Sequence, residues 1–246
     1  MERISELEPY LAGIVIGVRY RANFAVDDQL GRIVDQILYK KNSFFNFRVF
    51  PNVSSGINDK ALENNQTNDR LRIDNSNIVL QINFPQFGGK FTNQDLPKIA
   101  DAFEKEILNG VMSDFRIREL NRIGLIRRYV FTVDDLARVF VDKTIGRTLQ
   151  GVNDINLRFS KRIPSIEGVA MKGVNDYNNA IFNIIRHTDR PEIFMAVDYQ
   201  KYFDPFLASA SELKYQDFLS HAESFSKRSF LPWINENFIE ESNEQK

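Results

Sequence analysis

Two stretches of sequence decide the fold because they repeat each other. Residues 14–35 read IVIGVRYRANFAVDDQLGRIVD, and residues 121–142 read NRIGLIRRYVFTVDDLARVFVD. At an offset of 107 residues, nine positions are identical between the two stretches. They are Ile16, Gly17, Arg21, Phe24, Val26, Asp27, Asp28, Val34 and Asp35, which match Ile123, Gly124, Arg128, Phe131, Val133, Asp134, Asp135, Val141 and Asp142. Matches of this density on a shared pattern indicate an internal duplication.

Each copy has the pattern of a strand followed by a helix. Residues 12–21 alternate between apolar and other side chains, which is the period of a half-exposed strand. Apolar residues at helical spacing then predict a helix up to Leu38, with Asp27 or Asp28 capping its first turn. The second copy predicts a long strand over 116–131 and a short helix over 133–143 that is capped by Asp134 or Asp135.

Further elements follow in a similar order in both halves. In the first half we expect strands over 43–50, 70–74 and 77–84 and a helix near 94–111, with a loop or a ragged hairpin over 52–69. In the second half we expect strands over 153–163, 166–172, 179–187 and 192–199. A final helix carries Leu213, Phe218, Leu219, Ala222 and Phe225 on one face.

Runs of strands that are closed by a few helices predict an α+β protein. We expect two pseudo-repeats of a strand–helix–multistrand–helix unit, residues 1–112 and 113–246, that form one compact unit with antiparallel sheet and helices on one face. Such a duplication resembles the topology of the TATA-binding protein, in which two halves join edge to edge; topology alone carries no function. Gly17 and Gly124 would then occupy equivalent strand positions, where a missing side chain permits a close crossing or a bulge.

Composition places the chain among folded soluble proteins. Of its 246 residues, 43% are apolar and 26% are charged, and 32 basic residues nearly balance 33 acidic ones. The absence of cysteine excludes disulfides, thiolate metal sites and a cysteine nucleophile. No apolar run is long enough to cross a membrane. We therefore expect a cytoplasmic protein with no membrane partner.

Few residues point to catalysis. The paired aspartates of the repeat lie where helix caps are expected, and FGGK at 87–90 lacks the first glycine and the hydroxyl residue of a phosphate-binding P-loop. His187 and His221 are too few for most histidine metal sites. We expect no cofactor and no metal site. Asp198, followed by Gln200 and Lys201, leaves a metal-dependent nuclease as the alternative.

Arginines are concentrated in the middle of the chain. Residues 116–162 hold eleven Lys and Arg against five Asp and Glu. In the predicted strand, Arg116, Arg118, Arg122 and Arg128 share one parity and form a ladder, with Arg21 on the same face, where phosphates or carboxylates of a partner could dock. A solvated face that pairs with acids on helices is the structural alternative.

Three segments carry a family resemblance: RIGLIRRYVF (122–131), EIFMAVDYQKYFDPF (192–206) and LKYQDFLSHAESFSKRSFLPWI (213–234). They resemble a sporadically distributed family of uncharacterised prokaryotic proteins with a RIGLRYINR-like central strand. Ile126 and Arg127 depart from that pattern, and Tyr129 is displaced. The resemblance implies a cytoplasmic prokaryotic protein and no particular reaction. The patchy distribution of the family suggests mobile elements or antiviral defence.

These observations favour a non-catalytic binding or assembly component that uses an arginine-lined sheet face. A protein partner is the first expectation, and nucleic acid is the second. The alternative is a metal-dependent nuclease or another enzyme that acts on nucleic acid.

Overall fold

The computed structural model describes residues 4–49, 60–64, 66–131, 155–163, 175–186 and 192–239. The strands of these segments are β1 (Leu11–Tyr20), β2 (Arg48–Val49), β3 (Lys60–Asn64), β4 (Asp69–Ile73), β5 (Asn77–Asn83), β6 (Leu120–Phe131), β7 (Ile155–Ile163), β8 (Tyr177–Arg186) and β9 (Ile193–Leu207). They form one sheet in the order β2-β3-β4-β5-β1-β6-β9-β8-β7, and each neighbouring pair is antiparallel.

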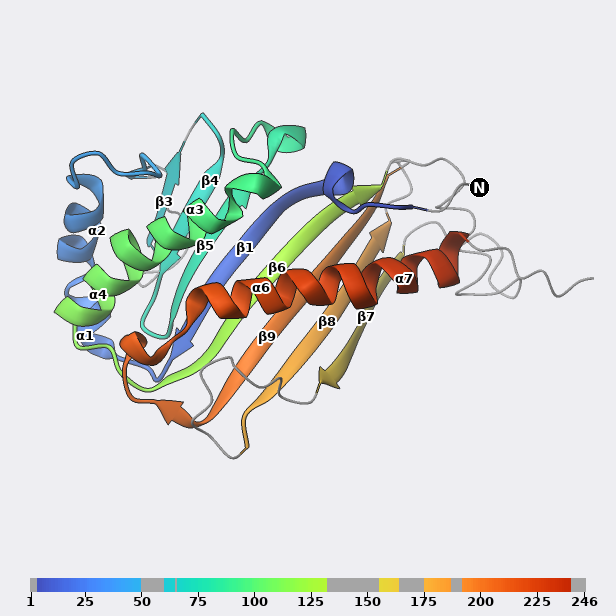
Figure 1. Cartoon of the computed structure of the whole chain (residues 1–246). Coiled ribbons are helices and arrows are strands. Elements are labelled where there is room, and N and C mark those ends of the chain that lie inside the picture. Colours follow the sequence, from blue (N-terminus) through green and yellow to red (C-terminus); the bar gives the residue numbers. More distant parts are fainter. Residues whose placement is uncertain are drawn as a thin grey trace, which may run out of the picture.

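Helices lie across one face of this sheet (Figure 1). The α-helices of the described segments are α1 (Phe24–Asp28), α2 (Leu30–Leu38), α3 (Leu96–Ala102), α4 (Asn109–Asp114), α6 (Tyr215–Phe225) and α7 (Leu231–Ile234). A π-helical segment, Phe103–Leu108, joins α3 to α4, and a second one, Ser226–Phe230, joins α6 to α7. None of the described helices is both long and apolar enough to span a membrane. The expected α+β class is confirmed.

The strand order has the same form on both sides of the central pair, β1 and β6. Outward from β1 the strands run β5, β4, β3, β2, and outward from β6 they run β9, β8, β7, so the first three strands on each side follow in the same sense and β2 has no counterpart among the described strands. Gly17 lies directly opposite Gly124 in this pair, flanked by Ile16 opposite Leu125 and Val18 opposite Ile123. The two identical glycines of the repeat therefore meet at the middle of the sheet.

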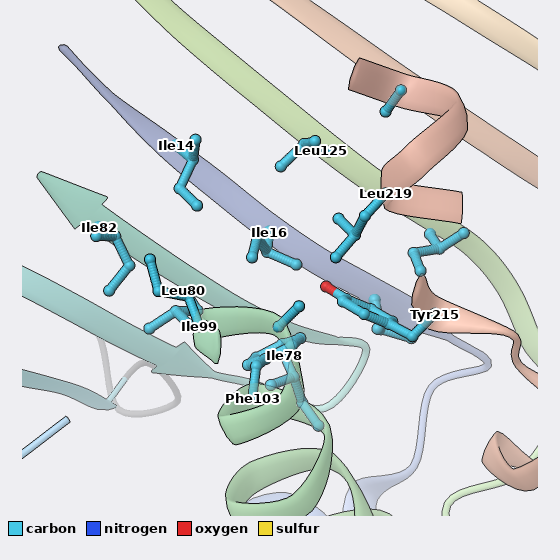
Figure 2. Close-up of a cluster of buried hydrophobic side chains, with 14 of the residues drawn as sticks. Ile14, Ile16, Ile78, Leu80, Ile82, Ile99, Phe103, Leu125, Tyr215 and Leu219 are labelled. Atoms are coloured by element: carbon cyan, nitrogen blue, oxygen red, sulfur yellow. The ribbon is translucent and has the colours of Figure 1, made fainter. Parts of the chain in front are cut away.

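The hydrophobic core fills the space between the sheet and the helices. Alternate residues of each strand point into it, and Ile14 and Ile16 of β1 are fully buried there. Figure 2 shows these side chains beside Phe103 from the π-helical segment and Leu219 from α6. Because successive strand residues point to opposite faces, the residues between these core positions lie on the other face of the sheet.

The strand expected over 116–131 begins four residues later, at Leu120. Arg116 has φ of 50°, in the left-handed region, and it ends α4: its N–H donates to Ser113, and the N–H of Ile117 donates to Met112. This is the hydrogen-bond pattern of a Schellman helix end, which needs one left-handed residue. Arg116 and Arg118 therefore precede the strand.

The strand expected over 43–50 is wrong over most of its length. Only Arg48–Val49 pair as β2. Asn42 and Asn46 are left-handed, with φ of 60° and 51°, and a strand cannot continue through such residues. The N–H of Phe44 instead donates to the carboxylate of Glu106 at 3.2 Å.

The expected cap of the first helix is also wrong. Asn23 caps α1, and its side chain accepts a hydrogen bond from the N–H of Ala25. Asp27 lies within α1, where its carboxylate accepts a hydrogen bond from the side-chain amide of Asn75. The paired aspartates therefore do not mark the start of the helix. The expected helix over 133–143 with Asp134 and Asp135, the strand over 166–172 and His187 lie outside the described residues.

The remaining strands agree more closely with expectation. The loop or hairpin expected over 52–69 includes β3, which pairs with β4. β9 extends to Leu207, well beyond the expected end at residue 199, and pairs with both β6 and β8.

Candidate functional site

The face of the sheet that lies opposite the helices is rich in arginine. Residues directly opposite each other in paired strands point to the same face, so the strand register assigns each side chain to a face. One row runs from Arg72 through Gly17, Gly124 and Gln200 to Arg162. The arginines that the register of the described strands places on this side are Arg19, Arg48, Arg70, Arg72, Arg122, Arg128, Arg158 and Arg162, and the carboxylates are Glu63 and Asp198. We call this surface the arginine face.

Two arginines lie opposite each other at its centre. Arg19 of β1 pairs in register with Arg122 of β6, and within the described segments neither has a carboxylate oxygen within 4.0 Å. Like charges in directly opposite strand positions are unfavourable. Between the strands, Gly17 and Gly124 contribute no side chains, and a hollow of about 100 Å³ is left beside the two guanidinium groups. The centre of the face thus brings two guanidinium groups together beside one hollow, which Asp198 also lines.

On the half of the arginine face that is formed by β6 to β9, two arginines lie against a stacked pair of tyrosine rings. The rings of Tyr177 and Tyr202 stack with centroids 4.6 Å apart and planes 8° from parallel. The guanidinium of Arg162 lies 4.1 Å from the centroid of Tyr177, and that of Arg122 lies 5.7 Å from the centroid of Tyr202. Cation–π contacts of this kind orient a guanidinium without neutralising its charge. Arg122 also donates from Nη1 to the hydroxyl of Tyr202 at 3.3 Å, so its remaining N–H groups, and those of Arg162, are the ones that an anion could contact.

Asp198 lies in the same hollow. Gln200 donates a short hydrogen bond to its carboxylate, and the hydroxyl of Tyr202 donates to the amide oxygen of Gln200 at 2.7 Å. Burial raises the pKa of Asp198, while the bond from Gln200 and the charges of Arg122 and Arg158 oppose that rise. Within the described segments, no cluster of three or more His, Asp or Glu could hold a metal ion. The neighbours of this carboxylate are thus amide and guanidinium groups.

The arginines expected from the sequence fall into two groups. Arg122 and Arg128 lie in β6 with one parity, as expected. Arg116 and Arg118 lie before this strand, so a four-residue ladder is wrong. Arg21 follows the last residue of β1, so it lies on neither sheet face, and its guanidinium pairs with Glu119 at 3.1 Å.

Arg128 has a partly structural role. Its Nη2 donates to the side-chain oxygen of Asn83 at 2.8 Å and to the carbonyl of Ile82 at 3.3 Å. Both acceptors are on β5, so the side chain crosses β1, and it does so at Gly13. A Cβ on Gly13 would lie 2.6 Å from that Nη2, which means that glycine is needed for the crossing.

Sequence analysis missed several residues of the arginine face. Arg158 and Arg162 share one parity within the expected strand 153–163, and this was the available signal. Arg19 and the two stacked tyrosines had no such signal, because their positions depend on which strands pair and in what register. FGGK forms a tight turn: Gly88 has φ of 77°, and a Cβ on Gly89 would clash with the backbone of Asn83.

No family model matches the chain, and no match was found among curated proteins. The function is therefore inferred from the arginine face itself.

Proposed function

We propose that this protein is a non-catalytic binding component and that the arginine face is its contact surface for nucleic acid. The observation that carries the proposal is the excess of arginine over carboxylate on one face of a chain whose total charge nearly cancels. Guanidinium groups bind phosphate through two parallel hydrogen bonds, and arginine is the preferred residue for this contact.

The width of the face fits a chain of phosphates better than a single small anion. Arginines lie on β4, β1, β6 and β7. Neighbouring strands are about 4.8 Å apart, so six intervals between β4 and β7 extend over roughly 29 Å. On β4, Arg70 pairs with Glu63 at 3.0 Å and Arg72 with Asp74 at 3.8 Å, so phosphates would compete with these carboxylates there. A polyanion of regular charge spacing can still contact several arginines of β1, β6 and β7 at once.

The composition of the face favours nucleic acid over an acidic protein. Protein interfaces carry an apolar core that is rich in aromatic residues. At the centre of the arginine face, by contrast, Arg19 lies opposite Arg122 and Gly17 lies opposite Gly124, and the apolar side chains beside them, Val15, Val79 and Ile126, are aliphatic. The rings of Tyr177 and Tyr202 are already stacked on each other and on guanidinium groups. We therefore expect contacts with phosphates and little reading of base sequence.

Fluorescence anisotropy with labelled single-stranded and double-stranded oligonucleotides tests this proposal. We expect the double variants Arg19→Ala/Arg122→Ala and Arg158→Ala/Arg162→Ala to bind more weakly. Each lost phosphate contact should also reduce the slope of log affinity against log salt by about one. The matched control is Arg32→Ala/Arg228→Ala, which removes two exposed arginines from helical segments. Asp198→Asn should tighten binding, because it removes a negative charge from the face.

The outcomes separate the alternatives. If no oligonucleotide binds at low salt, nucleic acid is the wrong partner; binding of polyglutamate in its place would point to an acidic protein. If the protein cleaves nucleic acid in the presence of a divalent metal and Asp198→Asn abolishes cleavage, the nuclease alternative replaces this proposal.

We also propose that residues 1–112 and 113–246 are copies of one unit, arranged like the halves of the TATA-binding protein. The nine identities, the equal strand order outward from β1 and β6, and the pairing of Gly17 with Gly124 support a duplication. An experimental structure tests it. We expect residues 133–143 to form a helix that corresponds to α1 and α2, and an extended conformation there would count against the duplication.

The resemblance to the sporadically distributed prokaryotic family remains a further proposal. A cytoplasmic setting and a role in defence or in a mobile element rest on that resemblance alone. The neighbouring genes test it: recurrent defence or mobile-element genes beside the coding sequence would support the proposal, and ordinary metabolic neighbours would oppose it.

A further inference from the structure

A second and larger cavity, of about 300 Å³, lies away from the hollow at the centre of the sheet. It is formed where β1 and β9 begin and where β6 and β8 end, together with Phe87, which follows β5. Its described walls are largely apolar, with contributions from Val130, Ile185 and Phe194. Concave sites of this size and character commonly bind small molecules.

Arg128 is the only charged side chain among the described residues that line the cavity. Its Nη2 is bonded to β5, but its Nε is buried and has no hydrogen-bond partner. Within the described segments, no carboxylate oxygen lies within 4.0 Å of this guanidinium. The cavity therefore combines apolar walls with one positive charge that has no carboxylate partner among the residues that the structure describes.

An uncompensated charge in such a place is unfavourable in the empty protein. Taking an ion out of water costs free energy unless an opposite charge or hydrogen bonds replace the water. Burial lowers the pKa of Arg128. Gly13 lets the guanidinium lie against β1, so the position of the charge is built into the fold.

We propose that this cavity binds a small amphiphilic carboxylate, with its hydrocarbon part against Val130, Ile185 and Phe194 and its carboxylate on Arg128. A carboxylate matches the single guanidinium in charge and in its two hydrogen-bond acceptors. The amide of Asn183, which also lines the cavity, supplies a further donor.

The volume of the cavity sets the size of the ligand. If each heavy atom occupies about 30 Å³, the share of one molecule in liquid water, a cavity of about 300 Å³ holds roughly ten heavy atoms. Octanoate has this size and is a suitable probe. Of the arginines on the arginine face, this cavity uses Arg128, whereas Arg19 and Arg122 line the central hollow, so variants at Arg19 and Arg122 leave the cavity lining unchanged.

Isothermal titration calorimetry of the whole chain with octanoate, 1-octanol and octylamine tests the proposal. We expect octanoate to bind about tenfold more tightly than 1-octanol, a difference of about 1.4 kcal/mol. In Arg128→Met this preference should disappear while 1-octanol still binds. Arg32→Met, on α2 and outside the cavity lining, is the matched control and should retain the preference.

Because Arg128 also joins β6 to β5, Arg128→Met could fail to fold. Ala196, which lies opposite Arg128 in the register of β6 and β9, takes no part in the hydrogen bonds of Arg128 to Asn83 and Ile82. Ala196→Leu fills part of the cavity, and we expect it to abolish octanoate binding. Asn183→Asp places a negative charge in the cavity and should weaken octanoate about tenfold. Equal binding of octanoate and 1-octanol to the unmodified protein, no binding of octanoate, or unchanged octanoate binding by Ala196→Leu would each overturn the proposal.

Discussion

Gly13 and Gly17 both lie on β1, at positions where a side chain would point to the arginine face, yet their surroundings differ. A Cβ on Gly13 would lie 2.5 Å from the carbonyl oxygen of Ile82, whereas a Cβ on Gly17 would lie 3.5 Å from a methyl group of Val79. We expect Gly13→Ala to lower the free energy of unfolding by about 1–3 kcal/mol, because backbone must move. Gly17→Ala, the matched control, should be neutral or stabilising by about 0.5 kcal/mol. Urea denaturation measures both; equal midpoints would contradict the assigned crossing of Arg128.

Asp198 is expected to make the folded protein less stable as the pH rises. Burial raises its pKa above the ordinary value of 3.8, so between 3.8 and the folded pKa the folded state binds more protons than the unfolded state. Stability contributed by this group therefore falls as pH increases through that window. We expect Asp198→Asn to have a higher melting temperature than the parent at pH 7, and the difference to vanish below pH 3.8. A lower melting temperature for Asp198→Asn at pH 7 would show that the carboxylate is stabilised by its neighbours.

Single residues of the site were predictable only where strand parity was enough. Arg122 and Arg128 share a face because they are six residues apart in one strand. The position of Arg128 beside Gly13, by contrast, follows from the register that also pairs Gly17 with Gly124, and no pattern within a single strand encodes which strands pair or in what register.

Arg116, which the sequence pattern predicts as a binding residue, instead forms the C-terminal end of a helix. It occupies the left-handed position that closes α4. A left-handed conformation costs an ordinary residue about 1–2 kcal/mol, and glycine adopts it without this cost. We expect Arg116→Gly to raise the free energy of unfolding by about 1 kcal/mol and Arg116→Val to lower it, as measured by chemical denaturation. Destabilisation by Arg116→Gly, or a loss of oligonucleotide binding, would assign Arg116 a role beyond ending the helix.

Regular elements were predictable where side-chain periodicity alone determined them. The strand expected over 12–21 is observed at Leu11–Tyr20, because burial alternates from Ile14 to Tyr20, over most of its length. The segment 43–50 failed although it is rich in phenylalanine. Phe45 and Phe47 are buried in the core on either side of left-handed Asn46, and apolar composition does not distinguish such an irregular segment from a strand.

At the scale of the whole molecule, the repeat was the most informative part of the sequence. Two copies that join edge to edge about a two-fold axis can pair equivalent residues, and Gly17 does lie opposite Gly124. The arginine face depends on this pairing, because it brings Arg19 next to Arg122. The positions of β4 and β7, which carry the outer arginines of this face, could not be predicted from the sequence. The apolar pattern of a short strand does not indicate which other strands it pairs with.

Contact between nucleic acid and the arginine face is tested most directly by NMR of the arginine Nε–Hε groups in the whole chain. During titration with a short oligonucleotide, we expect the signals of Arg19, Arg122, Arg158 and Arg162 to shift or broaden. The signals of Arg32 and Arg228, which are exposed on helical segments, should stay in place. Unchanged signals on the arginine face, or shifts confined to Arg32 and Arg228, would contradict the assignment of this face as the binding surface.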